Sequence, residues 1–169
     1  MLVGEKVCLG PLMQGDAPFL FQWLNTVELA RLNGSYRPSD QVKFDQWFAG
    51  VGADPARVTF AIRQAGDLRL LGYLQVINIQ PASQVAELGL LIGDVDAQGQ
   101  GFGQEAIGLA VAFCWRELNL QRLSMFVIGE NPRAVAAYGK AGFEIEGVMR
   151  RAAYVDGRFE NITVMGLLR

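Results

Sequence analysis

The chain has 169 residues, of which 51% are hydrophobic and 19% are charged, and its formal net charge is −2. This length suits a single domain over residues 1–169, and a slightly acidic chain offers no basic surface for nucleic acid. No apolar run approaches the roughly 20 residues that cross a bilayer, and the charged N-terminal segment is unlike a signal peptide. We therefore expect a cytoplasmic protein without a nucleic-acid or membrane partner.

The first half of the chain changes from a helical to a strand periodicity. Apolar residues recur every three or four positions over 20–27 and again over 42–51, which predicts two helices, the first capped by Asp16. Alternating runs separated by turn residues then predict an antiparallel meander. The three runs cover 58–64, 68–79 and 85–93.

The second half predicts a strand–helix–strand crossover followed by a hairpin. Because the long helix separates two strands, those strands should be parallel and joined by a right-handed connection. The hairpin is indicated by the two-residue turn Asp156–Gly157. The elements are a helix over 102–118, a strand over 122–128, a helix over 132–141 and strands over 143–150 and 158–168. The fold class is α+β, a mixed, mostly antiparallel twisted sheet of about six or seven strands with about four helices.

The residue types limit the chemistry. Histidine is absent, so acid–base catalysis must fall to Glu, Asp, Tyr, Lys or water. Cys8 and Cys114 lie in apolar stretches without the spacing of metal ligands. We expect them to be reduced thiols in the core, and we expect no metal site.

A glycine-rich bend, "DAQGQGFGQEA" over 96–106, joins a predicted strand to the long helix. Free backbone N–H groups and the helix dipole favour an anion at such a position, and glycines let the backbone approach it closely. A nucleotide-binding Walker loop is excluded, because Gly103 is followed by Gln104 and Glu105. The glycine spacing also disagrees with a dinucleotide fingerprint. A phosphate site and a simple turn without a ligand remain open.

Two motifs narrow this choice. The bend matches the pattern Q-x-x-G-x-G, and the segment 131–143 matches N-x-x-A-x-x-x-Y-x-K-x-G-F. The matching residues are Gln98, Gly101, Gly103, Asn131, Ala134, Tyr138, Lys140, Gly142 and Phe143. In this order, the motifs resemble those of the GNAT superfamily of N-acetyltransferases, closest to the ribosomal-protein alanine and spermidine N-acetyltransferase branch. The resemblance covers nearly the whole chain, although the basic residue common near Gly10 in that branch is missing.

The resemblance implies acetyl-CoA as the acetyl donor, with a central parallel strand pair that splays apart to admit it. The bend would hold the pyrophosphate, the end of the meander would pair with the pantetheine arm, and Asn131 would bond to that arm. Lys140 is either a phosphate ligand or a solvated surface lysine. The implied coenzyme A-binding residues are Leu91, Ile92, Gly93, Gln98, Gly99, Gln100, Gly101, Phe102, Gly103, Gln104, Asn131 and Lys140.

Glu87 is the candidate base. An alkylammonium acceptor, with a pKa of about 10.4, holds its proton at neutral pH and must lose it before attacking a thioester. Alternation places Glu87 among Val85, Gly89 and Leu91 on one strand face, and apolar surroundings make a carboxylate a better proton acceptor. We expect Glu87 to act through a water molecule. An exposed strand residue or a salt bridge is the structural alternative.

Tyr138 is the candidate acid. It matches the family's position for the group that protonates the departing thiolate, and a phenol with a pKa of about 10 can donate that proton. Core packing is the alternative role, because Val135, Tyr138 and Ala141 lie three residues apart on one helical face.

The acceptor is less defined than the donor. In the branch that the chain resembles, the acceptor pocket combines the linker between the first two helices with the late hairpin. The candidates are Tyr36, Arg37, Tyr154 and Glu160. A small-molecule amine and a peptide N-terminus are both open as acceptors, as are a monomer and a homodimer. A non-catalytic acyl-CoA-binding or sensing domain of the same fold is the alternative function.

Overall fold

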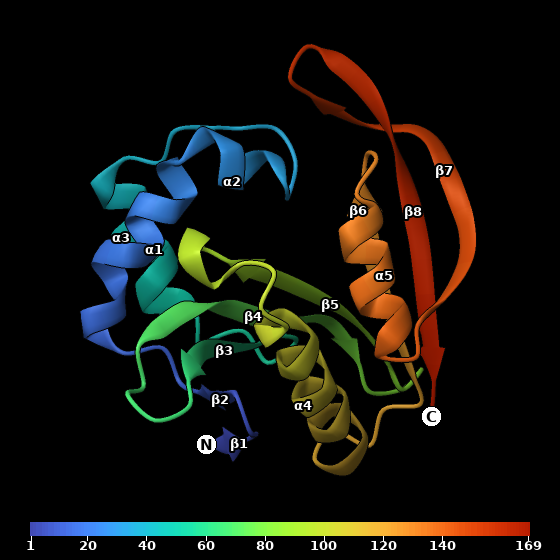
Figure 1. Ribbon diagram of the computed structural model, residues 1–169, viewed down its shortest axis with the longest axis horizontal. Helices are drawn as coiled ribbons and strands as arrows, with labels where there is room; N and C mark the ends of the chain where they lie inside the picture. The colour runs from blue at the N-terminus through green and yellow to red at the C-terminus, as the bar shows by residue number, and fades with distance from the viewer.

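The computed structural model describes all 169 residues as one mixed sheet with helices on both faces (Figure 1). The helices are α1 (Ala17–Asn25), α2 (Val27–Arg31), α3 (Gln41–Gly50), α4 (Phe102–Arg116) and α5 (Pro132–Lys140). The strands are β1 (Leu2–Val3), β2 (Val7–Gly10), β3 (Val58–Gln64), β4 (Leu70–Gln80), β5 (Val85–Ile92), β6 (Arg122–Ile128), β7 (Glu144–Val155) and β8 (Arg158–Leu168). None of the helices has the length and apolar character that a membrane span requires.

The eight strands lie in the order β1-β2-β3-β4-β5-β6-β8-β7. Every neighbouring pair is antiparallel except β5 and β6, which α4 connects as a parallel pair. This confirms the predicted α+β fold with a central parallel pair. The strand count is higher than expected because the short strands β1 and β2, outside the predicted runs, pair with each other at one edge, and α2 adds a short helix.

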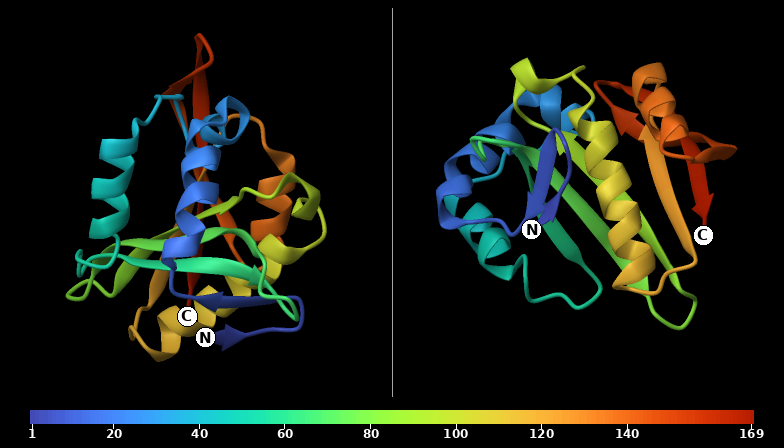
Figure 2. Two further views of the ribbon diagram at one scale, coloured as in Figure 1. Left: turned by 90° about the vertical axis from the view of Figure 1, so that its left-hand side faces the viewer. Right: turned by 60° about the horizontal axis from the view of Figure 1, so that its bottom comes forward.

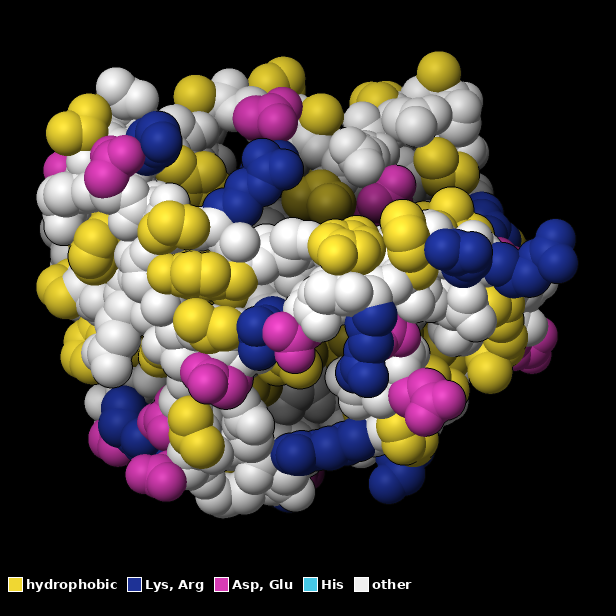
Figure 3. All heavy atoms as spheres, turned by 90° about the horizontal axis from the view of Figure 1, so that it is seen from above, with side chains coloured by type: hydrophobic (Ala, Val, Ile, Leu, Met, Phe, Trp, Pro, Cys, Tyr) yellow, Lys and Arg dark blue, Asp and Glu magenta, His cyan; other side chains and the backbone are white.

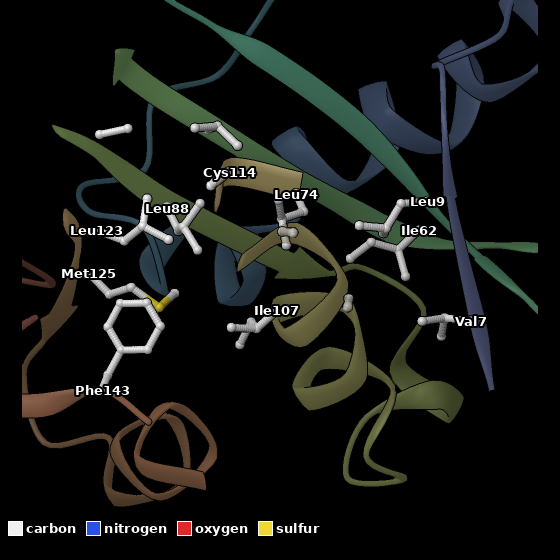
Figure 4. Packing of buried hydrophobic residues seen from close by; sticks show 14 of the residues in the cluster. Val7, Leu9, Ile62, Leu74, Leu88, Ile107, Cys114, Leu123, Met125 and Phe143 are labelled. Atoms are coloured by element: carbon white, nitrogen blue, oxygen red, sulfur yellow. The ribbon is translucent and has the colours of Figure 1, made fainter. Parts of the chain in front are cut away.

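Two hydrophobic cores fix the sheet from opposite faces. The larger core lies under α4 and α5 and includes Leu74, Leu88, Ile107 and Leu123 (Figure 4). The helices α1, α2 and α3 lie together on the other face (Figure 2), and the smaller core beneath them includes the fully buried Phe44. Each fully buried Leu, Ile or Phe contributes roughly 1.5–3 kcal/mol, so both faces hold the central strands firmly.

Two details of the N-terminal helices differ from the sequence expectation. Asp16 precedes α1 but does not cap it; its Oδ2 accepts hydrogen bonds from the Met13 N–H at 2.7 Å and the Arg63 guanidinium at 2.6 Å. Val42, the first residue of the apolar pattern over 42–51, is 66% exposed, and Phe44 packs into the core instead. For Asp16, the ion pair with Arg63 therefore replaces the predicted cap of α1.

The parallel pair separates after only a few residues. β5 and β6 are paired at Val85–Arg122, Ala86–Leu123 and Glu87–Ser124, and no further pair follows. β5 continues to pair with β4 as far as Ile92, opposite Gly72. The backbone of β5 beyond Glu87 is therefore unpaired on the side that faces β6.

The β7–β8 hairpin forms the far edge of the sheet and projects beyond it at the Asp156–Gly157 turn (Figure 1). Asp156 and Gly157 have φ angles of 51° and 78°, as the predicted two-residue turn requires. The tip of the hairpin comes close to the segment after α2. The Ser35 hydroxyl donates to the Tyr154 carbonyl, and Arg31 forms an ion pair with Asp156.

Candidate functional site

A cleft of about 500 Å³ lies where β5 and β6 separate. Residues 88–92 and 126–128 form two of its walls, and the bend after β5, the start of α4 and one side of α5 complete it. Leu32 and Asn33 line it from the face that α1–α3 cover. Figure 3 shows the surface hollowed between its two halves, with Lys and Arg side chains bordering the lower hollow. A ligand in this cleft can reach both faces of the sheet.

The exposed edge of β5 offers backbone hydrogen bonds to a ligand. From Leu88 to Ile92 the strand pairs with β4 on one side, from Leu88–Val76 to Ile92–Gly72. On the other side, N–H and C=O groups face the cleft without a strand partner. An extended molecule can bind such an edge in the manner of an added strand.

The glycine bend closes one end of the cleft. Gly99 and Gly101 have φ angles of 81° and 85°, a backbone conformation that residues with side chains rarely adopt. Gly101 is also the N-cap residue of α4, where the first helical N–H groups lack partners within the helix. The bend thus presents free N–H groups and the positive end of the helix dipole to the cleft, which suits an anion.

Two glutamine side chains hold the shape of this bend. Gln98 Nε2 donates to the Ile92 carbonyl at 3.0 Å, and Gln100 Nε2 donates to the Asp96 carbonyl at 2.6 Å. Gln98 lines the cleft, whereas Gln100 does not. Each amide therefore uses an N–H donor to stabilise the bend, and that donor is not free to bind a ligand.

Two cations that the sequence analysis did not single out lie beside the bend. Lys6 Nζ donates to the Gln100 carbonyl at 3.2 Å. The Arg133 guanidinium lies so close to Gly99 that a Cβ at that position would be 2.8 Å from Nη2. Arg133 occupies a variable position of the N-x-x-A motif, so the motif does not identify it. Lys6 is 94 residues from Gln100 in sequence, and only the fold brings the two together.

Tyr138 lines the cleft from α5 while its ring packs against the larger core. Burial raises the pKa of Tyr138. The phenol therefore stays protonated at and above neutral pH and can act as a proton donor. Tyr138 therefore packs against the core and lines the cleft, and its role as the acid stays a prediction.

Asn131 is the N-cap residue of α5 and lines the cleft. Its Oδ1 accepts a hydrogen bond from the Ala134 N–H at 3.0 Å, and Pro132 occupies the first helical position. The side-chain oxygen is therefore used as a helix cap, which leaves the amide N–H donors for a ligand. Lys140, at the last turn of α5, also lines the cleft and is exposed.

Glu87 lies at the last paired position before β5 and β6 separate, next to Ser124 on β6 and Ile77 on β4. It shares a strand face with Leu91, which belongs to the core under α1–α3. Its side chain is half-buried and does not line the cleft itself. Glu87 is thus beside the cleft, on the face that Leu32 and Asn33 approach.

The residues expected at the acceptor pocket belong to two segments that the fold brings together. Tyr36 is half-buried and Arg37 exposed, both just beyond the Ser35 contact with the hairpin tip. Tyr154 is 52% exposed and packs its ring edge-on against Phe159. Glu160 Oε1 accepts from Arg158 Nε at 2.6 Å. None of the four expected residues lines the cleft.

Most of the residues expected to bind the donor do line it. These are Leu91, Ile92, Gln98, Gly99, Gly101, Phe102, Gly103, Gln104, Asn131 and Lys140. Gly93 and Gln100 do not. The Gly93 N–H donates to the Leu71 carbonyl at 3.0 Å, and a Cβ on Gly93 would lie 2.0 Å from the Trp23 ring. Gly93 is required for close packing against α1, which its sequence position did not reveal.

Comparisons with known proteins agree with this architecture. A family model described as an acetyltransferase (GNAT) domain matches residues 6–144. The chain is 30% identical to the spermidine N(1)-acetyltransferase of Vibrio cholerae over 69% of this chain and 66% of that protein. It is 33% identical to the probable N-acetyltransferase YjcK of Bacillus subtilis over 64% of this chain and 60% of that protein. These alignments span less than two thirds of the two relatives.

The fold comparison extends further than the sequence alignments. The crystal structure of spermidine N-acetyltransferase from Vibrio cholerae in complex with CoA and spermine is similar, with a TM-score of 0.89. The match covers 96% of this chain and 95% of the other at 26% sequence identity.

Proposed function

Because the chain belongs to the GNAT family of acetyltransferases, we propose that it transfers an acetyl group from acetyl-CoA to a primary amine. Family membership confirms the resemblance that the two motifs predicted. The observation that carries the proposal is the cleft between the separated parallel strands, closed by the glycine bend and lined by Tyr138.

Two features of the cleft support acetyl-CoA as the donor. The unpaired edge of β5 from Leu88 to Ile92 can bond to the amides of the pantetheine arm, and the N–H groups at Gly99–Gly103 can bind the pyrophosphate. Asn131 retains amide N–H donors that can reach the arm. When bound, acetyl-CoA supplies an activated acetyl thioester, and this chain supplies the groups that handle protons.

Glu87 is proposed to take the proton from the acceptor ammonium through a bridging water molecule. Its position at the point of strand separation places its carboxylate beside the cleft rather than in it, which leaves room for a water molecule between base and amine. The acceptor would approach from the α1–α3 face, because Glu87 and the lining residues Leu32 and Asn33 all lie toward that face.

Tyr138 is proposed to protonate the thiolate that leaves when the carbon–sulfur bond breaks. It lines the cleft from the opposite side, on α5, and its raised pKa keeps the phenolic proton in place until the thiolate forms. The proposed base thus lies on β5 and the proposed acid on α5, and both are close to the point where β5 and β6 separate.

For the acceptor, we propose an amine whose pocket is built by the segment after α2 and the β7–β8 hairpin, with Tyr36, Arg37, Tyr154 and Glu160 near its entrance. The relative with the similar fold holds spermine as well as CoA, which makes polyamines one class to test. A peptide N-terminus is the other class to test, since the sequence leaves both kinds of primary amine open.

A thiol-release assay tests the proposed transfer. Acetyl-CoA should raise the melting temperature by binding the folded state, and one class of amine should then cause release of coenzyme A thiol. Polyamines, amino sugars, amino acids and peptides beginning with Ala or Ser form the panel. The protein's own thiols should contribute little background, because both cysteines are buried and burial raises the pKa of Cys114 to about 12.

The same assay tests the base. If Glu87 accepts the proton, Glu87→Gln should slow transfer most at low pH, where deprotonated amine is scarce, and the deficit should shrink toward the pKa of the amine. A deficit of equal size at every pH would assign Glu87 to substrate positioning. Bound acetyl-CoA with no thiol release from any amine would favour an acyl-CoA sensor instead.

A further inference from the structure

Positive charge gathers at the glycine bend from two distant parts of the chain. The Lys6 ammonium comes from the turn between β1 and β2, and the Arg133 guanidinium comes from the first turn of α5. Neither group takes part in any of the ion pairs of the structure. Two cations without carboxylate partners therefore lie beside a backbone segment that already favours an anion.

Lys6 is placed by a carboxylate at the start of α4. The Glu105 side chain accepts three backbone hydrogen bonds, from the N–H groups of Glu5 at 2.7 Å, Lys6 at 2.8 Å and Val7 at 2.9 Å. These bonds fix the turn between β1 and β2 against the first turn of α4. The Lys6 ammonium then bonds to the Gln100 carbonyl at 3.2 Å, and a Cβ on Gly101 would lie 3.5 Å from it.

Arg133 is placed on the other side of the bend by α5. It follows Pro132 in the first helical turn, lines the cleft, and brings its Nη2 next to Gly99. A side chain at Gly99 would displace the guanidinium as well as strain the backbone, since its Cβ would be 2.8 Å from Nη2. The glycine at this position thus keeps both the bend and Arg133 in place.

We propose that Lys6 and Arg133 form a two-sided clamp for the pyrophosphate of the coenzyme, and that Glu105 positions Lys6. This inference rests on the proposed function, since it concerns the same acetyl-CoA cleft. The backbone N–H groups of the bend bind the phosphate oxygens, and the two cations neutralise their charge from opposite sides. Charge-assisted bonds of this kind are stronger than those between neutral groups.

Binding measurements with two ligands test the clamp. Lys6→Met and Arg133→Gln should each weaken the binding of coenzyme A about tenfold, and by the same factor for 3′-dephospho-coenzyme A, which retains the pyrophosphate. The affinity of each variant should also depend less on salt than that of the wild type. Arg116→Gln, at the other end of α4, is the matched control and should bind both ligands normally.

Three results would overturn the clamp. Unchanged affinity of both variants would show that the cations only border the bend. A loss seen with coenzyme A but not with 3′-dephospho-coenzyme A would assign them to the 3′-phosphate. If the variants without ligand had lower melting temperatures, and the loss of affinity grew with the loss of stability, the weaker binding would come from a damaged fold. Wild-type protein that binds no coenzyme A would instead contradict the proposed function itself, so the two failures are distinct.

A double-mutant cycle tests the positioning by Glu105. Glu105→Gln should weaken coenzyme A binding and flatten its salt dependence in the wild-type background, because the turn no longer holds Lys6 at the bend. In the Lys6→Met background the same change should have no further effect on affinity. Additive losses would show that Glu105 acts on the fold of α4 and not through Lys6.

Discussion

Tyr138 contacts the larger core with its ring and also lines the cleft, so its packing can be tested separately from its proposed role as the acid. Tyr138→Phe keeps the ring and removes only the hydroxyl. We expect the rate of acetyl transfer to fall about 100-fold, the contribution typical of a general acid. Acetyl-CoA affinity should stay within about threefold of the wild-type value, because the lost interaction belongs to the transition state.

The measurement compares steady-state transfer with equilibrium binding of acetyl-CoA in the same variant. Wild-type turnover in Tyr138→Phe would leave core packing as the only role of this residue.

For single residues, sequence motifs predicted those cleft residues that lie close together along the chain, such as Gln98, Gly101 and Tyr138. They could not predict Lys6, because its approach to the bend depends on the pairing of β1 and β2 and on Glu105.

Among the elements, α1 depends on a buried ion pair. Asp16 and Arg63 are 5% and 9% exposed, and their charged groups are 2.6 Å apart. Asp16→Ala should lower the free energy of unfolding by about 3–5 kcal/mol, since it leaves the Arg63 charge buried without a partner. Urea denaturation measures this change.

Two comparisons interpret that loss. Asp16→Ala with Arg63→Met should regain part of the stability, because the double variant buries no charge. Lys43→Gln, which removes the exposed pair with Asp40, should leave the unfolding transition almost unchanged. If Asp16→Ala were as mild as Lys43→Gln, the buried pair would not be what anchors α1 to β3.

Periodicity predicted the longer elements well for a physical reason. In β3, β6 and β8 the observed bounds equal the runs of alternating or apolar residues, because side chains on one face of each strand meet a core. The two residues of β1 are too few to show any period, and α2 spans only five residues. The role of Asp16 was misassigned because its partner, Arg63, lies 47 residues away.

For the whole molecule, the cleft exists because the two parts of the sheet are joined by only three residue pairs between β5 and β6. A second connection joins the two parts where the segment from α2 to Ser35 meets the tip of the β7–β8 hairpin. It consists of the Arg31–Asp156 ion pair and the hydrogen bond from the Ser35 hydroxyl to the Tyr154 carbonyl. These contacts flank Leu32 and Asn33, the two residues that line the cleft from the α1–α3 face. This bridge, formed by the Arg31–Asp156 and Ser35–Tyr154 contacts, should therefore order the proposed acceptor entrance without touching the proposed acetyl-CoA site.

Asp156→Asn tests this division between the two ends of the cleft. Asparagine tolerates the φ of 51° at this turn, so the hairpin should keep its shape while the ion pair is lost. The KM for the amine should rise by up to about fivefold, the equivalent of an exposed pair worth about 1 kcal/mol. Acetyl-CoA affinity and the melting temperature should not change, and Lys43→Gln, which removes an exposed ion pair away from the cleft, serves as the control. An Asp156→Asn variant with a normal amine KM, or with weakened acetyl-CoA binding, would contradict the proposal that the bridge orders the acceptor side alone.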